Sequence, residues 1–173
     1  MNSIKIKTTL DPKKLKTFLP KMILDVVKDI AETVKDETTE NLDKGRDVRG
    51  QTFAPIKEST REVRRLRGHS GDKPLVASGE MKDSVKARQT KKGYVVFAES
   101  YGNRSTPDVH HQGFITKNNP TIKGKQFFFK GKRIPSRPWF FNESNIESSK
   151  RLNMQFQEIY KEFFENFNIK LTK

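Results

Sequence analysis

One stretch organises the chain: Ile134-Pro135-Ser136-Arg137-Pro138-Trp139-Phe140-Phe141, which holds the only tryptophan and two of the eight prolines. Each proline fixes its own φ angle and biases the residue before it toward extended geometry, so the sequence predicts a stiff, extended segment followed by three aromatic side chains. Such a segment is typical of a docking device that enters either a core or a groove on a partner. The alternative interpretation is a turn that closes a sheet, with Trp139 as an ordinary core residue.

The composition of the 173 residues favours one domain with much exposed surface. Hydrophobic and charged residues each make up 32% of the chain, so part of it should lie in exposed loops or in surfaces that become buried only on assembly. The absence of cysteine excludes disulfides, thiol catalysis and thiolate metal sites. Neither a membrane-spanning apolar stretch nor an apolar signal core is present, so we expect a soluble protein without a membrane partner.

Positive charge is concentrated in the middle of the chain. The formal charge of +14 divides into +1 for residues 1–44, +13 for residues 45–138 and 0 for residues 139–173. A positive field confined to one segment indicates a polyanion nearby, most commonly nucleic acid. The alternative is that basic loops keep a small protein soluble.

The N-terminal part predicts a strand and a long helix. Side chains alternate between apolar and polar from Ser3 to Thr8, as in a half-buried strand. Apolar residues then recur at three- and four-residue steps, which predicts an amphipathic helix from Pro12 toward Leu42, capped by Asp11. Pro20 predicts a kink or a restart, and Gly45 predicts the end of the helix.

The middle of the chain predicts basic loops, a short helix and strands. Phe53 is the one aromatic anchor of the loop that follows residue 45, and a short helix that begins at Ser59 or Thr60 carries four arginines. Ser78 is placed to cap one helical turn. A hairpin is predicted from residue 85 to residue 99, and a second one over residues 126–134 with a basic tip.

A second amphipathic helix is predicted from Ser149 to Asn168, with an edge strand over Ile169 to Leu171. We therefore predict an α+β fold in which an antiparallel β-sheet packs against the long N-terminal helix and the C-terminal helix, with long basic loops. The chain is interpreted as a single domain over residues 1–173. Its three parts are the strand and helix at 1–45, the basic loop and sheet region at 46–141, and the C-terminal helix at 142–173.

Candidates for catalysis are few, so we expect no enzyme, no catalytic residue and no cofactor. His110, His111 and Asp108 could share a metal, but neighbouring residues of an extended segment point to opposite faces, and no second pair of ligands stands at a suitable spacing. The favoured interpretation is a hydrogen-bonded structural or interface histidine. No glycine-rich phosphate loop and no nucleophile elbow occurs.

Four separated motifs together resemble the phage virion morphogenesis and tail completion family. They are Gly50-Gln51-Thr52-Phe53-Ala54-Pro55-Ile56, the stretch Pro74-Leu75-Val76-Ala77-Ser78-Gly79-Glu80-Met81-Lys82-Asp83-Ser84-Val85, His111-Gln112-Gly113, and Ile134-Pro135-Ser136-Arg137-Pro138-Trp139-Phe140. The resemblance spans about residues 46–141, and it implies a relation to neck proteins with the HK97 gp10-like fold. It further implies a non-enzymatic virion protein at the head-proximal end of the tail. Such a protein forms a ring, for example a hexamer, that takes part in head–tail joining and DNA passage.

The leading hypothesis is thus an assembly protein of the phage neck or tail, present in the host cytoplasm during assembly and then in the virion. Its expected partners are further copies of itself, neighbouring connector, neck and tail proteins, and genomic DNA contacted without sequence specificity. A free-standing basic nucleic-acid-binding protein is the alternative, and a metal-dependent hydrolase ranks last. The residues expected at a subunit or partner interface are Pro135, Arg137, Pro138, Trp139, Phe140 and Phe53. Those expected to face DNA or an acidic partner are Arg61, Arg64, Arg65, Arg67, Lys130, Lys132 and Arg133.

Overall fold

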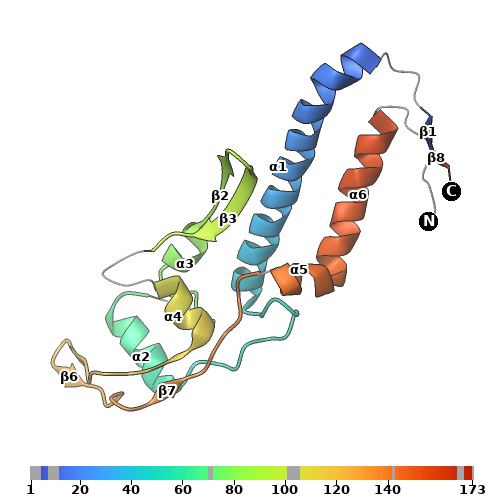
Figure 1. Ribbon diagram of the computed structural model, residues 1–173. Helices are drawn as coiled ribbons and strands as arrows, with labels where there is room; N and C mark the ends of the chain where they lie inside the picture. The colour runs from blue at the N-terminus through green and yellow to red at the C-terminus, as the bar shows by residue number, and fades with distance from the viewer. Residues whose placement is uncertain are drawn as a thin grey trace.

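The computed structural model describes residues 5–7, 12–69, 72–100, 106–141, 143–166 and 170–172. Within these ranges, side chains are described from residue 19 to residue 165, except those of residues 106, 108, 109, 143 and 144. Two helices, α1 (Pro12–Lys44) and α6 (Lys150–Asn166), lie side by side, and most other elements gather around the C-terminal half of α1 (Figure 1). The predicted α+β class is confirmed.

Helix α1 follows the apolar periodicity of the sequence. Ala31, Val34 and Leu42 are buried on its inner face, while the side chains before residue 19 lie outside the described part, as does Asp11. The helix is continuous through Pro20, so the predicted restart does not occur. It ends as predicted at Gly45, whose φ of 65° is a left-handed conformation that glycine adopts without steric cost.

The first predicted hairpin is confirmed, and it packs on α1. Strands β2 (Val85–Thr90) and β3 (Gly93–Ala98) pair antiparallel, with Val85 opposite Ala98 and Thr90 opposite Gly93. The helical turn α3 (Glu80–Asp83) precedes them. The residue that caps α3 is Gly79 rather than Ser78, because a φ of 92° at this position suits glycine.

The second predicted hairpin is wrong. Strand β7 (Arg133–Ile134) pairs with β4 (Phe114–Ile115), whereas β6 (Lys125–Gln126) pairs with β5 (Thr121–Ile122). The reason is a tight turn at Lys123 and Gly124, where both φ angles are positive, as two-residue hairpin loops require. The turn at Gly131 forms as expected, but it returns the chain toward Thr116, whose carbonyl oxygen accepts a hydrogen bond from the Gly131 N–H at 2.8 Å.

The remaining helices are α2 (Glu58–Leu66), α4 (Thr106–Gln112) and α5 (Glu143–Ser148). Helix α2 confirms the predicted short basic helix. Helix α4 corrects the prediction of an extended segment at His110 and His111, and α5 was not predicted. The short terminal strands β1 (Lys5–Lys7) and β8 (Lys170–Thr172) are present and pair antiparallel with each other, so all four described sheets have two strands.

Two apolar clusters hold the described elements together. The first contains Trp139 and five other buried side chains, which come from the end of α1, the loop after it, the segment before α3, α3 itself and the start of β2: Leu42, Phe53, Leu75, Met81 and Val85. The second joins α1 to α6 through Val34, Val48, Phe141 and Leu152. Burial of these side chains is the main stabilising contribution, because apolar surface removed from water favours folding in proportion to its area.

Candidate functional site

Hydrogen bonds fix the proline-bounded segment on both sides. The Ser136 hydroxyl donates to the His111 carbonyl oxygen at 2.6 Å, and the Arg137 N–H donates to the His110 carbonyl oxygen at 3.2 Å. From the loop after α1, the Val48 N–H donates to the Pro138 carbonyl oxygen at 3.0 Å. The segment therefore lies between α4 and this loop, and hydrogen bonds on both sides fix it in place, in agreement with the stiff segment that its prolines predict.

Gly113 lets α4 and this segment approach closely. A methyl group at Gly113 would lie 2.6 Å from the Ser136 nitrogen and 2.8 Å from the Ile134 carbonyl oxygen. Its φ of 79° also lies in the left-handed region. Only glycine satisfies both conditions, which explains why a glycine follows the two histidines.

Trp139 lies in the core of the single chain, with 1% of its surface exposed. Its ring packs edge-on against Phe140, and its Nε1–H donates to the Pro107 carbonyl oxygen at 3.3 Å. Phe53 belongs to the same cluster, whereas Pro135 is exposed and Pro138 is half-buried. Trp139 and Phe53 are thus buried without a partner, and a subunit contact by this segment remains a prediction for its more exposed residues.

A groove of about 510 Å³ lies between α2, the stretch before α3 and the segment that begins at β7. We call it the α2 groove. Its apolar lining includes Ile56, Val63, Leu75, Met81, Phe114 and Ile134. Its charged lining comprises six cations and one carboxylate: Lys57, Arg64, Arg67, Lys132, Arg133, Arg137 and Glu80. An apolar floor with a strongly cationic rim suits a ligand that carries both apolar groups and negative charge.

Two guanidinium groups sit partly buried in the α2 groove. Arg64 reaches from α2 to the opposite wall, where it donates to the carbonyl oxygens of Lys73 at 2.7 Å and Val76 at 3.2 Å. Burial lowers the pKa of Arg64 and of Arg137, and the positive charge of Arg137 lowers the pKa of Arg64 further. Burial also lowers the pKa of His110, with further lowering by Arg137 and Arg64, so the imidazole is neutral at pH 7.

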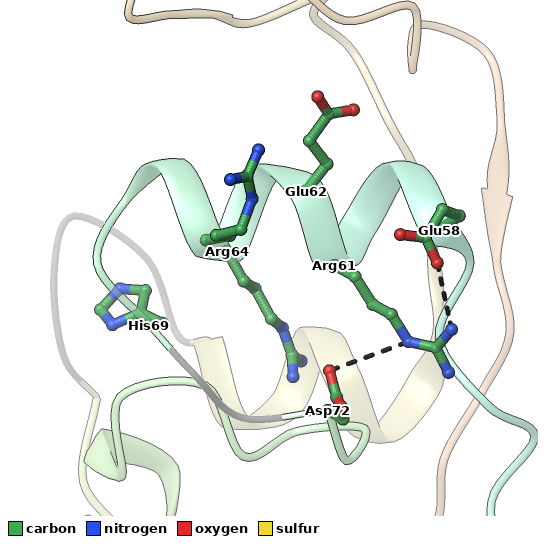
Figure 2. A pocket seen from close by; sticks show the side chains of 7 residues that line it. Glu58, Arg61, Glu62, Arg64, His69 and Asp72 are labelled. Atoms are coloured by element: carbon green, nitrogen blue, oxygen red, sulfur yellow. Dashed lines mark hydrogen bonds and ion pairs between the residues drawn. The ribbon is translucent and has the colours of Figure 1, made fainter.

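The other side of α2 has a different electrostatic character. A pocket of about 560 Å³ there is lined by three arginines, His69 and three carboxylates. Arg61 lies between Glu58 and Asp72, at 3.1 Å and 3.8 Å (Figure 2). Because its arginines and carboxylates balance, this pocket attracts an anion less than the α2 groove does.

The structure divides the seven cations that the sequence analysis assigned to DNA or an acidic partner. Arg64, Arg67, Lys132 and Arg133 line the α2 groove, which brings together residues almost 70 positions apart. Arg61 and Arg65 line the second pocket, which Arg64 also borders, and Lys130 is exposed at the turn that precedes β7. Sequence reasoning did not place Lys57, Arg137 or His110 in a cationic groove: Lys57 directly precedes α2, but Arg137 and His110 are far from α2 in the chain and no local pattern connects them to it.

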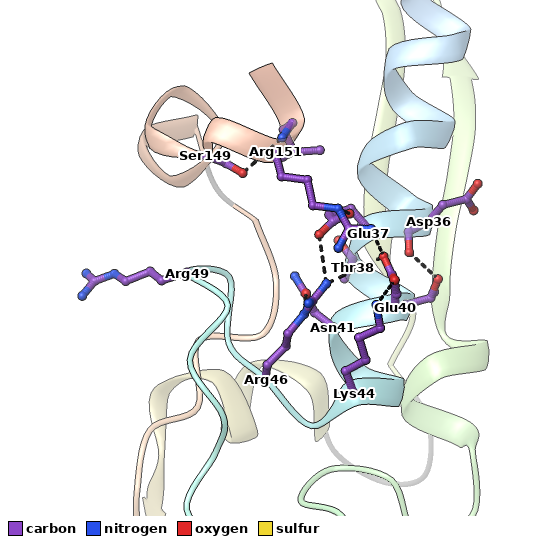
Figure 3. Close-up of polar contacts among 12 residues, drawn as sticks. Asp36, Glu37, Thr38, Glu40, Asn41, Lys44, Arg46, Arg49, Ser149 and Arg151 are labelled. Carbon is purple, nitrogen blue, oxygen red and sulfur yellow. Dashed lines mark hydrogen bonds and ion pairs between the residues drawn. The ribbon is translucent and has the colours of Figure 1, made fainter. Parts of the chain in front are cut away.

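A polar network joins α1, α6 and the loop after α1 (Figure 3). The buried Glu37 carboxylate contacts Arg151 at 3.0 Å and Arg46 at 3.4 Å, and Glu40 pairs with Lys44 and Arg151. Burial raises the pKa of Glu37, whereas a hydrogen bond from Lys44 lowers the pKa of Glu40. These carboxylates are fully engaged within the chain, so we assign the network a structural role.

A metal site is not found in the described part of the chain. Among the described side chains, no group of three or more His, Asp or Glu residues could hold a metal ion, and the Asp108 side chain lies outside that part. His110 packs edge-on against Phe114, whereas its buried Nδ1 atom has no hydrogen-bond partner among the described residues, so the predicted hydrogen bond is not found at this atom. No described helix combines the length and the apolar character that a membrane span requires.

The comparisons with known proteins agree with the four motifs. No curated protein and no solved structure matches the chain. A sequence model of the phage virion morphogenesis family matches residues 3–155, which covers all four motifs and most of the chain. The chain therefore belongs to the phage virion morphogenesis family, whose members generally have structural roles in the virion.

Proposed function

We propose that this protein is a non-enzymatic component of the phage neck or tail completion region. In this proposal, several copies form a ring at the head-proximal end of the tail, and the ring takes part in head–tail joining and in the passage of DNA. The observation that carries it is membership of the phage virion morphogenesis family over residues 3–155.

The distribution of charge supports the proposal. Four of the predicted cations border one groove, while the C-terminal 35 residues carry no net charge. A cluster of cations at one groove can orient a subunit against an acidic neighbour or against DNA without reading bases, because contacts to phosphates carry affinity but no sequence information.

The test is a phage that carries a nonsense mutation in the gene for this protein. Lysates should contain DNA-filled heads and separate tails, and joined particles should return when the wild-type protein is supplied from a plasmid. Negative-stain electron microscopy counts the three kinds of particle. Complete, infectious particles in the absence of the protein would refute the proposal.

Non-specific DNA contact is assigned to the exposed cations outside the α2 groove, Arg65 and Lys130. We expect weak binding to duplexes of unrelated sequence, with an affinity that falls steeply with salt. Fluorescence anisotropy over a salt series measures this dependence. Tight binding by a monomer or dimer would instead favour the free-standing nucleic-acid-binding protein.

A further inference from the structure

Among the described residues, the cations that line the α2 groove outnumber its carboxylates. Six cations border it against the single carboxylate of Glu80, and Arg64 and Arg137 are partly removed from water there. Among the described residues, no carboxylate forms an ion pair with Arg137. Like charges held close together in a partly desolvated groove oppose each other, and a carboxylate from outside would relieve that repulsion.

An acidic counterpart lies at the far end of the helix pair. A pocket of about 230 Å³ between α1 and α6 is lined, among the side chains that the structure describes, by three carboxylates and by apolar groups. We call this surface the acidic end: Met22, Asp25, Val26, Asp29, Ile159, Glu162 and Phe163. None of its three carboxylates forms an ion pair with a described residue, in contrast to Glu37 and Glu40 near the other end of α1. Ile23 and Tyr160 add exposed apolar surface close by, at 51% and 46% exposure.

These two surfaces lie at opposite ends of the molecule. The α2 groove is at the end that contains α2 and β7, and the acidic end is in the half of α1 and α6 that points away from it (Figure 1). One chain therefore cannot bring its own two surfaces together. A contact between such unlike surfaces of two copies leaves one of each free, so it repeats and closes into a ring when the rotation permits.

We propose that the α2 groove of one copy binds the acidic end of a second copy. The proposal rests on the assembly role proposed above and names the contact that would build the ring. Each surface offers the other both an apolar centre and charges of opposite sign, which is how specific interfaces are commonly arranged. Duplex DNA is a poorer occupant, because its charged sugar–phosphate surface offers no apolar groups to pack on the floor formed by Val63, Leu75 and Phe114.

Charge reversal on each surface tests the contact in the purified full-length protein. One variant carries Arg67→Glu and Arg133→Glu at the rim of the groove, and the other carries Asp25→Lys and Glu162→Lys at the acidic end. Among the described residues, none of these four side chains forms an ion pair, so their replacement removes no such contact within the described fold. Sedimentation velocity at low salt should show oligomers for the wild type and at least about tenfold weaker self-association for each variant, because like charges across an interface are strongly disfavoured.

The decisive step is to mix the two variants. Each mixed pair then has one native contact and one contact with the charges exchanged, so oligomers should reappear in the mixture alone. The matched controls are Lys91→Glu with Lys92→Glu at the tip of the β2–β3 turn, and Glu99→Lys with Glu147→Lys, two exposed carboxylates that line neither surface. They change the net charge equally, and they should leave the oligomers intact. Circular dichroism confirms that every variant is folded.

Three results would overturn the proposal: a wild type that stays monomeric at all salts, variants that still assemble, or a mixture that does not recover. The phage experiment separates this failure from that of the proposed function. Unjoined heads and tails in the nonsense mutant together with unaffected oligomers of the charge variants would keep the virion role and reject this contact. Normal particles in the nonsense mutant together with rescue in the mixture would reject the virion role and keep the contact.

Discussion

Replacing Trp139 by alanine should destabilise the monomer itself, independently of any assembly. The side chain is 1% exposed, and it packs among Leu42, Phe53 and Met81 in the first apolar cluster. Removing a buried large aromatic costs about 3–5 kcal/mol, because transfer free energy is lost and a cavity remains. The loss of the hydrogen bond to the Pro107 carbonyl oxygen places the expected cost near the upper end, at about 5 kcal/mol.

Such a loss is large for a domain whose whole stability is typically about 5–15 kcal/mol. For a chain of this size it should lower the melting temperature by roughly 10–20 °C. Thermal unfolding followed by circular dichroism measures the change, because the variant lacks the only tryptophan and gives no tryptophan fluorescence.

Two controls make the result specific. Trp139→Phe keeps most of the apolar volume and should lose clearly less stability than Trp139→Ala. Tyr160→Ala removes a half-exposed aromatic and should change the melting temperature little. A melting temperature for Trp139→Ala within roughly 2 °C of the wild type would refute the assignment of Trp139 to the monomer core, since only removal of a solvent-exposed ring changes stability so little.

Three further predictions follow from the site. Gly113→Ala should lower the free energy of unfolding, measured by urea titration, by at least about 3 kcal/mol, because strain in the left-handed conformation adds to a clash with the Ser136 backbone. Gly124→Ala has a similar φ but open space around it, so it should lower the same free energy by only about 1–2 kcal/mol. The pKa of His110 lies below its ordinary value of 6.5, so the unfolded chain binds more protons than the folded chain in this range. The free energy of unfolding should therefore fall as the pH drops through 6.5 toward the folded pKa. In the His110→Asn variant, the urea midpoint should depend less on pH over the same range. Arg151→Ala should cost about 1–2 kcal/mol by removing one of the cations that face a buried carboxylate at the α1–α6 junction, and an unchanged midpoint would show that this contact contributes nothing.

Local sequence patterns were enough to predict the helices and the hairpin whose formation depends on residues close together in the chain. The three- and four-residue apolar spacing predicted α1 and α6, and the turn Lys91-Lys92-Gly93 between two strand-like segments predicted the β2–β3 hairpin. The prolines around Arg137 predicted a stiff segment that ends in aromatic side chains, but whether Trp139 enters its own core or a partner's groove stayed open until the structure placed it in the core. In each case the information lies within one or two turns of helix or one hairpin, where sequence spacing fixes which side chains share a face.

Only the tertiary structure decided the pairings over long distances. Strand β7 takes β4 as its partner instead of the adjacent aromatic run, and the terminal strands β1 and β8 pair across almost the whole chain. Strands of two or three residues carry too little periodicity to specify a partner, so the choice is made by turns with positive φ and by the packing of the elements between them.

The candidate site shows the same division. The sequence by itself determined that the middle of the chain is strongly basic and that the four motifs belong to one family. Folding then decided which cations act together: Arg64, Arg67 and Arg137 border one groove, while Arg61 is neutralised by Glu58 and Asp72. The physical reason is that a charge is set by residue type, whereas its neighbours and its exposure to water are set by residues that are distant in the chain.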